Sequence, residues 1–496
     1  MTSSAALTTD TDQALREHLL RRDGQEDLCF ALHRPSQGHR RHSFLVSEPI
    51  LPEPGEREVH GNAGFRAEYF LRAAERAAEA GAGLVLLHSH PAGRSWQDLS
   101  RDDIDAERGH AAQTLALTGQ PLVGMTLAGD GAWSARTWTR AGRGDYARVD
   151  HATVRVAGER LQLTHHPRLS PIPDPNDSVQ RRTISAWGPD AQAALARLRI
   201  GIIGAGSVGA LVAEALARTG IRQLVLIDFD SIKTHNLDRL LHATARDVRL
   251  ARSKVETLQR ALGRSATATD PIIEAHELSI VERAGFALAL DCDVLVSCVD
   301  RPWPRYALNL IAYAYLIPVI DGGIKVTTAG GTRLTGADWR AHVAAPTRQC
   351  LECLGQYDPG LVASEREGQL DDPHYIDGLP PDHPARANEN VFAFSMSTAA
   401  METLQMLSMV IAPSGVSDAG AQHYHFVTGQ LDTDSHACRS HCPFSNDLLA
   451  QGDNCAVPIT GAHAAADDER AHRRARRRSP PIRFSHLIDR ILDRVR

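Results

Sequence analysis

Two histidines stand two residues apart at the end of an apolar run. The run Gly83–Leu87 has the pattern of a buried strand and leads directly into His88 and His90. Side chains two residues apart on a strand point to the same side, so both imidazoles can reach one metal ion. Ser100 and Asp103 follow at the start of a segment with helical spacing. The sequence therefore predicts a metal site at the end of this strand.

A glycine-rich turn further along the chain is suited to hold a nucleotide. The apolar run 198–203 leads into Gly204-Ala-Gly206-Ser-Val-Gly209 and then a helical segment, and the next apolar run ends at Asp228. Gly204 permits a tight turn, Gly206 lets the backbone approach a phosphate, and Gly209 lets the helix pack close to the strand. The helix N-terminus would then offer free N–H groups to the anion.

The residues after this turn favour ATP over a dinucleotide. A nicotinamide dinucleotide needs one carboxylate at the strand end and little else nearby. Here several polar and charged residues follow Asp228, namely Asp230, Asn236, Arg239 and Lys254. Cations and amides of this kind suit a triphosphate. The strand-like run 293–299 ends in Asp300, at the sheet edge where Mg²⁺ would bind.

Four of the eight cysteines form two close pairs. Cys350 and Cys353 are separated by two residues, and Cys438 and Cys442 by three. This spacing is typical of a tetrahedral structural zinc site, with His441 as an alternative to one thiolate. A closed site of this kind would contribute stability and no catalysis.

The composition is that of a globular protein with two or three domains. The chain has 496 residues, of which 43% are apolar and 23% charged, and its net charge is −6. Such a charge implies no general affinity for nucleic acid or membranes. We find no apolar run of the length that a membrane span needs and no signal-peptide pattern, and therefore expect a cytoplasmic protein.

The metal motif resembles that of the JAMM (MPN-type) zinc isopeptidases. Their signature is a distant Glu, then H-x-H-P, then S-x-x-D, and the segment from His88 to Asp103 matches its last two parts. By this resemblance His88, His90 and Asp103 would bind the catalytic zinc, and Ser100 would help to stabilise the oxyanion. Three protein ligands leave one zinc position open for a water, whose pKa falls to about 7.

Two assignments within this motif have alternatives. The resemblance implies a glutamate as general base, for which Glu26 is expected and Glu48 is the alternative. Asp98 and Asp102 compete with Asp103 as the third ligand, because the spacing after the second histidine is about one residue longer than in the eukaryotic members.

The second half of the chain resembles the adenylation domain of ubiquitin-activating enzymes and of bacterial ThiF-type sulfur-carrier adenylyltransferases. The resemblance covers roughly residues 178–445 and rests on motifs in the family's order: G-x-G-x-x-G, D-x-D, N-L-x-R, a later Lys, a strand ending in Asp, and P-x-x-D-G-G. It implies a nucleotide site that includes Asp230. By the same resemblance Asp228 would bind the ribose, Asn236 would support the phosphate pocket, and Asp300 would hold Mg²⁺.

The family resemblance also gives roles to the basic residues. Arg239 and Lys254 would bind the phosphates and act in catalysis, with Arg252 as an alternative to Lys254, because the interval before Lys254 is about two residues longer than usual. Arg182 matches an arginine that crosses a dimer interface to the partner's ATP. We therefore expect a homodimer.

The expected fold class is α/β, with a JAMM-type α/β metalloprotease domain followed by a Rossmann-like ThiF-type adenylation domain with a structural zinc site. We expect the first domain to span residues 1–160, a linker 161–180, the second domain 181–455, and a basic tail 456–496. The tail is expected to be a solvated extension, with contact to an acidic partner or nucleic acid as the alternative.

Together the resemblances imply one polypeptide with two opposed activities on a ubiquitin-like protein, as in bacterial modification systems. The second domain would use ATP, Mg²⁺ and a structural Zn²⁺ to adenylate the modifier's C-terminal carboxylate, and the first would trim the modifier or remove it from targets with its catalytic Zn²⁺. One alternative is a sulfur-carrier adenylyltransferase with a carrier-trimming protease, for sulfur transfer of the thiamine, molybdopterin or cysteine type. Another is a non-catalytic scaffold.

The acceptor of the activated carboxylate is the last open question of the sequence. The segment Leu354–Asn388, where a thioester-forming loop would lie, contains no cysteine. Cys455 is the one candidate, since Cys29, Cys292 and Cys298 lie in segments with a buried pattern. The expected partners are a ubiquitin-like or sulfur-carrier protein and a conjugating enzyme.

Overall fold

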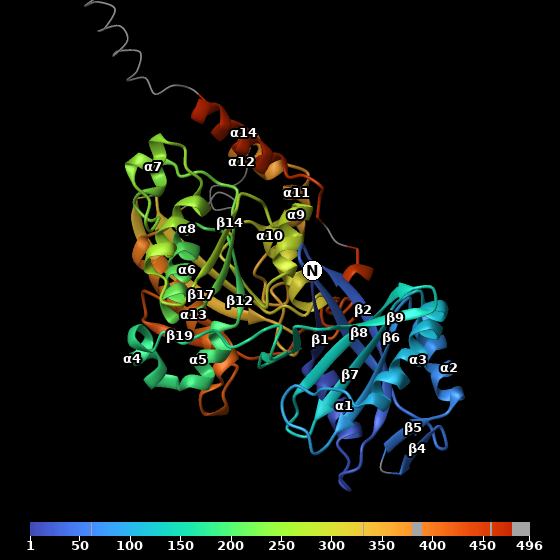
Figure 1. Cartoon of the computed structure of the whole chain (residues 1–496). Coiled ribbons are helices and arrows are strands. Elements are labelled where there is room, and N and C mark those ends of the chain that lie inside the picture. The colour runs from blue at the N-terminus through green and yellow to red at the C-terminus, as the bar shows by residue number, and fades with distance from the viewer. Residues whose placement is uncertain (61, 331, 379–388, 457–458, 479–496) are drawn as a thin grey trace, which may run out of the picture.

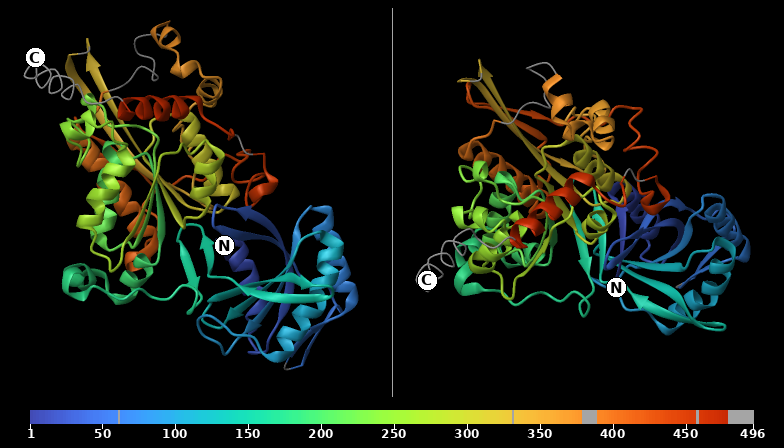
Figure 2. Two further views of the ribbon diagram at one scale, coloured as in Figure 1. Left: turned by 45° about the horizontal axis from the view of Figure 1, so that its top comes forward. Right: turned by 90° about the horizontal axis from the view of Figure 1, so that it is seen from above.

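The computed structural model describes residues 1–60, 62–330, 332–378, 389–456 and 459–478. They form two α/β domains that lie side by side (Figures 1 and 2). The first has a nine-stranded mixed sheet in the order β11-β10-β1-β3-β2-β6-β7-β8-β9, and a small hairpin β4-β5. Its elements are β1 (Thr2–Thr8), α1 (Thr9–Leu19), β2 (Leu28–Gln37), β3 (Arg41–Ile50), β4 (Arg57–His60), β5 (Asn62–Phe65), α2 (Ala67–Glu79), β6 (Gly83–His90), α3 (Arg101–Thr118), β7 (Leu122–Ala128), β8 (Trp133–Gly142), β9 (Asp145–Asp150), β10 (Thr153–Ala157) and β11 (Gln162–His165).

Apolar side chains alternate between the two faces of this sheet and build a core on each. On one face Leu15 and Leu19 of α1 pack against Leu87. On the other, α2 and α3 cover Phe30 and Leu86. Burial on both faces explains why β6 reads as an uninterrupted apolar run in the sequence.

The second domain has an eight-stranded sheet in the order β14-β13-β12-β15-β16-β17-β18-β19. The first five strands are parallel, and the last three extend the sheet in antiparallel fashion. Its elements are α4 (Asp177–Trp187), α5 (Pro189–Ala196), β12 (Arg199–Ile203), α6 (Ser207–Thr219), β13 (Gln223–Ile227), α7 (Ala245–Arg249), α8 (Lys254–Ser265), β14 (Ile272–His276), α9 (Arg283–Leu290), β15 (Val294–Ser297), α10 (Pro302–Ala314), β16 (Val319–Ala329), β17 (Arg333–Ala344), α11 (Pro359–Arg366), α12 (Pro373–Gly378), α13 (Phe392–Ile411), β18 (Ala421–His425), β19 (Gln430–Asp434) and α14 (Ala464–Arg478).

Helices cover both faces of the parallel part of this sheet. α6, α8 and α13 pack on one face and α9 and α10 on the other, which gives the α/β Rossmann-like arrangement that the sequence predicts. The strand order reverses at β12, whose neighbours are β13 and β15. The loops that follow β12 and β15 therefore leave the sheet toward opposite faces, at the carboxyl ends of the strands, where open α/β sheets bind their ligands.

The expected linker, residues 161–180, is only partly irregular. β11 lies within it and pairs with β10, so the first sheet extends beyond residue 160. α4 also begins within it, at Asp177, and only residues 161 and 166–176 have neither helix nor strand. Among the described helices, none combines the length and the apolar character needed to cross a membrane.

The two domains are docked through buried polar contacts as well as joined by the chain. Asp293, at the start of β15, lies 2.7 Å from the guanidinium of Arg41 on β3. Arg155 of β10 donates a hydrogen bond to the carbonyl of Leu316, in the loop before β16 (2.9 Å). Because Asp293 and Arg155 are both buried, each needs such partners, and these contacts stabilise the junction.

Both chemical motifs lie on strands that point away from this junction. β6 starts beside it, where the side chain of Asn454 donates to the carbonyl of Gly81 (3.0 Å), and it ends at His90. β12 also starts there, with its first amide bound to Asp293 (2.9 Å), and it leads into Gly204. Each motif therefore lies at the end of its strand that is farther from the junction.

Candidate functional site

The glycine-rich turn connects β12 to α6 with the geometry that its glycines predict. Gly204 has a φ of +94°, and a Cβ there would collide with the carbonyl oxygen of Cys298. A Cβ on Gly209 would collide with the carbonyl of Gly204, whereas one on Gly206 would reach open space. Among the described residues, no side chain caps the N-terminus of α6, so the amides of its first turn are available to an anion.

Two aspartates and a lysine meet beside this turn, at the end of β13. Asp228 accepts hydrogen bonds from the amides of Ala205 and Asp230, both at 2.7 Å. Lys254 Nζ lies 2.5 Å from an Asp230 oxygen and 3.8 Å from an Asp228 oxygen. Burial raises the pKa of Asp228 to about 6, although Lys254 opposes this shift. Burial would lower the pKa of Lys254, but the two carboxylates raise it above its usual range, so the ammonium stays charged and offsets part of their negative charge.

Two further residues from distant parts of the chain lie near the cluster or the glycine-rich turn. Asp300 is exposed after β15 and lies near enough to Lys254 to contribute to its raised pKa. The side chain of Asn390, just before α13, donates to the hydroxyl of Ser207 at the start of α6 (3.0 Å). The sequence analysis missed Asn390, because nothing in the local pattern connects it with a turn more than 180 residues away.

The other predicted nucleotide residues have local partners in the described chain. The Asn236 side chain accepts a hydrogen bond from the amide of Lys233 (2.9 Å), and Arg239 donates to the carbonyl of His235 (2.7 Å). Both side chains thus stabilise the loop after β13. Arg182 is exposed on α4, which packs against α5.

The described part of the C-terminal tail is not a solvated extension, so that expectation is wrong up to residue 478. Residues 479–496 lie outside the described residues. α14 lies across one end of the second sheet (Figure 2). Its basic residues pair with acidic ones of that domain: Arg470 with Glu282 (2.6 Å), Arg473 with Glu277, and Arg477 with Glu256 (2.6 Å). Much of the positive charge that favoured an external acidic partner is therefore balanced within the chain.

α14 and the residue before it also contact the two loops that carry the site carboxylates. Glu469 accepts hydrogen bonds from the amide (3.2 Å) and the hydroxyl of Ser231, which follows the D-x-D motif. The His463 ring packs edge-on against Phe229, the middle residue of that motif, with ring centres 5.4 Å apart. It packs in the same way against Trp303, at the start of α10 (5.5 Å). These contacts connect the loop after β13 with the loop after β15.

His88, His90 and Asp103 come together at the outer end of β6. The Nε2 atoms of the two histidines are 3.2 Å apart, and Asp103 oxygens lie 3.9 Å from His88 Nε2 and 3.7 Å from His90 Nε2. Ligand atoms of a tetrahedral zinc with bonds of about 2.0–2.2 Å lie roughly 3.3–3.6 Å apart. The residues present therefore fit one zinc ion with a position left open.

Ser100 and Gln97 orient two members of this cluster. Ser100 caps α3, and its amide (3.0 Å) and hydroxyl (2.7 Å) both donate to Asp103. The Gln97 carboxamide oxygen lies 3.3 Å from His90 Nδ1, as expected for a residue that fixes the ring of a metal ligand. The Ser100 hydroxyl is directed at the aspartate here, so an oxyanion role would require it to turn.

Glu26 is the acid that faces this cluster. It precedes β2, which pairs with β6 so that Leu28 lies opposite His88. Burial raises the pKa of Glu26, and its carboxylate is close enough to His90 and Asp103 to interact electrostatically with both. A carboxyl group in this position can exchange a proton with a group bound at the cluster.

The alternative acids lie elsewhere. Glu48 pairs with Arg34 (3.4 Å) and Arg76 (3.3 Å). Asp98 and Asp102 are exposed, and neither belongs to the group of ligand atoms around the histidines. The geometry therefore favours the first-choice assignments over all three alternatives.

The four paired cysteines form one cluster. Their sulfur atoms lie within 4.8 Å of one another, and those of Cys350 and Cys442 are 3.6 Å apart. Thiolates bound to zinc at about 2.3 Å in a tetrahedron lie roughly 3.8 Å apart, so the cluster fits this ion. The amide of Cys350 also donates to the sulfur of Cys438 (3.1 Å). His441 is exposed and lies outside the cluster.

Cys455 lies far from the nucleotide turn. Its thiol donates to the carbonyl of Gly452 (3.0 Å) and lies beside Tyr315, in the loop before β16. That loop is at the edge where the parallel strands begin, whereas Gly204 is at the edge where they end. Burial also raises the pKa of Cys455, so little reactive thiolate forms. Its position and its pKa both argue against a thioester there.

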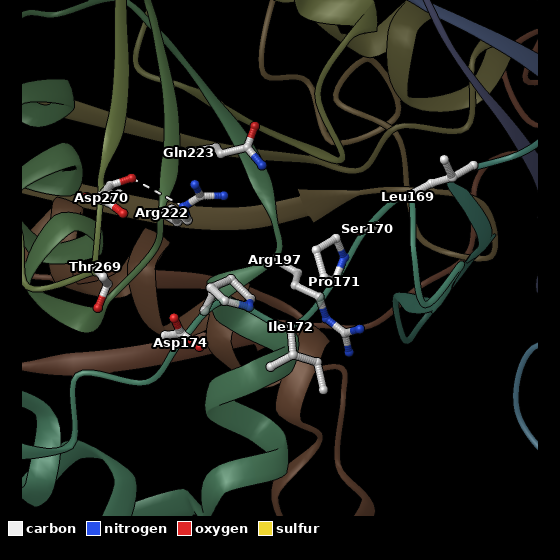
Figure 3. A pocket seen from close by; sticks show the side chains of 12 residues that line it. Leu169, Ser170, Pro171, Ile172, Asp174, Arg197, Arg222, Gln223, Thr269 and Asp270 are labelled. Carbon is white, nitrogen blue, oxygen red and sulfur yellow. Dashed lines mark hydrogen bonds between the residues drawn. The ribbon is translucent and has the colours of Figure 1, made fainter.

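A cavity of about 330 Å³ lies at the same edge as the domain junction. Figure 3 shows its lining, which includes residues 169–174, Arg197, and Arg222 at the start of β13. Arg222 donates to the carbonyl of Asp270 across it (3.2 Å). The cavity is separated from the glycine-rich turn by the length of the parallel strands.

Known proteins resemble the second domain. A sequence model of the ThiF family matches residues 179–432. The molybdopterin-synthase adenylyltransferase of Escherichia coli (strain K12) is 31% identical over 139 residues, which are 27% of this chain and 52% of that protein. The ubiquitin-like modifier-activating enzyme 5 of Drosophila grimshawi is 29% identical over 144 residues, 27% of this chain and 35% of that protein. The chain thus spans about half of these relatives or less.

The solved structures that resemble the chain are more distant in sequence. E. coli MccB with ATP is 18% identical, with a TM-score of 0.40, over 55% of this chain and 75% of that protein. The family match begins at residue 179, so the first domain lies outside it.

Proposed function

The chain belongs to the ThiF family, and we propose that its second domain uses ATP to adenylate the C-terminal carboxylate of a ubiquitin-like or sulfur-carrier protein. The observation that carries this proposal is the cluster of Asp228, Asp230 and Lys254 beside the glycine-rich turn. A dinucleotide site has no use for the lysine, whereas a triphosphate does. Two of the matched relatives are named as an adenylyltransferase and as a modifier-activating enzyme.

The chain's own groups would have distinct roles in this reaction. Asp228 would accept hydrogen bonds from the ribose hydroxyls, and the amides of α6 and the side chains of Arg239 and Lys254 would bind the phosphates. A carboxylate oxygen of the carrier attacks the α-phosphorus, and the bond to the bridging oxygen breaks. Pyrophosphate leaves with the electron pair, and no residue of the chain is modified covalently. Asp300 would hold Mg²⁺, which neutralises charge on the phosphates.

The test is pyrophosphate exchange into ATP with ubiquitin-like and sulfur-carrier proteins that end in glycine. We expect exchange with at least one of them and a loss of at least about 100-fold in Asp300→Asn, because charge on the phosphates is then poorly neutralised. Asp270→Asn, an aspartate at the opposite edge of the sheet, is the matched control. Absence of exchange with every carrier, or full exchange in Asp300→Asn, would contradict the proposal.

We further propose that the first domain is a zinc-dependent protease acting on the same carrier or its conjugates. Its support is the cluster of His88, His90 and Asp103 with Glu26 facing it. Zinc would lower the pKa of a water and polarise the scissile amide. Glu26 would take the proton from that water and give it to the leaving amine.

Cleavage of a carrier fused at its C-terminus to a second protein tests this assignment. His88→Ala and Glu26→Gln should each reduce the rate at least about 100-fold, the usual scale for general acid–base groups, while Glu48→Gln should leave it unchanged. If Glu26→Gln cleaves the fusion at the same rate as the intact protein, the general base is a residue other than Glu26. Cleavage at an unchanged rate in His88→Ala would contradict a role for zinc at this cluster in the reaction.

The four cysteines and the remaining partners complete the proposal. We propose that the cysteine cluster binds a structural zinc, and that Arg182 reaches the nucleotide of a second copy in a homodimer. Because Cys455 lies at the edge of the sheet opposite the nucleotide turn, the reaction on this chain would stop at the carrier adenylate. The group that accepts the activated carboxylate, either the thiol of a conjugating enzyme or a sulfur donor, would come from another molecule. A band of thioester-linked carrier on this chain in a non-reducing gel would contradict that last step.

A further inference from the structure

Two histidines of β18 share one face of the antiparallel edge of the second sheet. On the other face, Tyr424 of β18 stacks on Trp339 of β17 with ring centres 4.8 Å apart, and Trp339 stacks on Phe394 of α13 (5.2 Å). Side chains alternate along a strand, so His423 and His425, on either side of Tyr424, point away from α13. The apolar packing on one side therefore fixes both imidazoles on the other.

Carboxylates from both neighbouring strands meet these imidazoles. In the strand register, Asp338 of β17 lies opposite His425, and Asp432 of β19 lies opposite His423. His425 Nδ1 is 2.7 Å from an Asp338 oxygen, and its Nε2 is 3.3 Å from an Asp432 oxygen. The two rings have their centres 4.5 Å apart. One ligand atom from each of Asp338, His423 and His425 lies within 4.8 Å of the others.

We propose that Asp338, His423 and His425 bind a divalent transition-metal ion such as Zn²⁺, with Asp432 near enough to add a fourth ligand. Imidazole nitrogens combined with a carboxylate suit Zn²⁺, Co²⁺ or Ni²⁺, whereas Mg²⁺ and Ca²⁺ prefer sites made of oxygen alone. The ligands stand on paired strands, so little has to move for them to bind the ion. The ion would hold β17, β18 and β19 together at an exposed edge of the sheet.

A metal-free ion pair is the simpler use of the same residues. A protonated His425 between the carboxylates of Asp338 and Asp432 would need no metal. That arrangement leaves His423 without a role, although it shares the same face.

Cobalt binding distinguishes the two arrangements in the full-length protein. The protein carries His88→Ala and His90→Ala, which remove the other imidazole cluster, and Co²⁺ at the cysteines is recognised by its thiolate charge-transfer absorption. Beyond the Co²⁺ bound at the cysteines, we expect one further equivalent of Co²⁺ per chain. It should show visible absorption bands without thiolate charge transfer, and Zn²⁺ should displace it. His423→Ala should weaken this binding by at least about 10- to 100-fold, the scale on which supporting residues already act at metal sites. The matched control is the variant His436→Ala, which removes an exposed histidine just after β19. This variant should bind Co²⁺ as tightly as the parent protein.

A second variant guards against a folding defect. Asp338→Asn keeps the size of the side chain and removes its charge, so it should also weaken Co²⁺ binding, with an unchanged circular dichroism spectrum. Unchanged binding in both His423→Ala and Asp338→Asn would overturn the proposal and leave the ion pair of His425 as the explanation. Absence of the additional equivalent in the parent protein would do the same.

Discussion

The contact between Glu469 and the loop after β13 allows a quantitative test of whether α14 belongs to the nucleotide site. The loop begins with Asp228 and Asp230, and Ser231, which Glu469 binds, comes next. Displacing this loop should therefore move the two carboxylates. We predict that Glu469→Gln weakens ATP binding, while Asp468→Asn, the neighbouring exposed acid on the same helix, does not.

The size of the effect follows from the contacts of Glu469. It accepts two hydrogen bonds from Ser231 and lies 3.3 Å from Lys233 Nζ. Hydrogen bonds to a charged group contribute about 1.5–3 kcal/mol each. The Lys233 side chain is 48% exposed, so that ion pair contributes about 1 kcal/mol or less. Glutamine keeps one accepting oxygen, which leaves a loss of about 2 kcal/mol. At about 1.4 kcal/mol per factor of ten, this is roughly 30-fold in Kd when loop and site are fully coupled.

The assay is calorimetric binding of ATP, which needs no carrier protein. Glu469→Gln should raise the Kd by up to about 30-fold. Hydrogen exchange of the amides at residues 231–233 should become faster in the same variant, because the bond to the Ser231 amide is weakened. A Kd within twofold of the parent, together with faster exchange, would show that α14 holds the loop without influencing the nucleotide, and the reasoning would be refuted.

Three more measurements test other parts of the site. ATP binding should weaken as the pH falls through about 6, where the Asp228 carboxylate becomes protonated and loses its charge. The variant Asp228→Asn should bind ATP weakly at every pH. ATP binding by the parent protein that does not change with pH would contradict this. Cys353→Ser should lower the zinc content by one ion per chain and reduce the melting temperature, because metal binding contributes to folding. An unchanged zinc content in this variant would contradict the assignment of a structural zinc site to the cysteine cluster. Cys455→Ser should adenylate carriers at the parent rate, and a loss of activity in it would show that the position of Cys455 has been misjudged.

The motifs that could be predicted from the sequence are those whose residues are close together in the chain. The glycine-rich turn follows from local requirements, because Gly204 needs a positive φ and Gly209 needs close contact with Gly204. Likewise, His88 and His90 fall on one side of β6 because they are two residues apart. The strands β12, β13 and β15 were recognisable because burial on both faces makes them apolar almost throughout.

What was missed depends on pairing between distant segments. α14 is polar on its own and resembles a solvated tail. Its place in the fold depends on ion pairs with glutamates of α8 and of the segment between β14 and α9. The bond from Asn390 to Ser207 and the cluster around His423 also join strands or helices that no local period connects. Choosing between Glu26 and Glu48 needed the register of β2 against β6.

The docking of the two domains at the starting edges of β6 and β12 has a kinetic consequence. β6 has eight residues and β12 five, so about 26 Å and 17 Å of strand separate the two chemical motifs from the junction, roughly 40 Å in all. Within one chain, a carrier tail released at one motif would have to leave that site before it reached the other. The two activities would then be unchannelled, and a mixture of two half-inactive proteins would process and activate a carrier as fast as the intact chain at the same concentration of working sites.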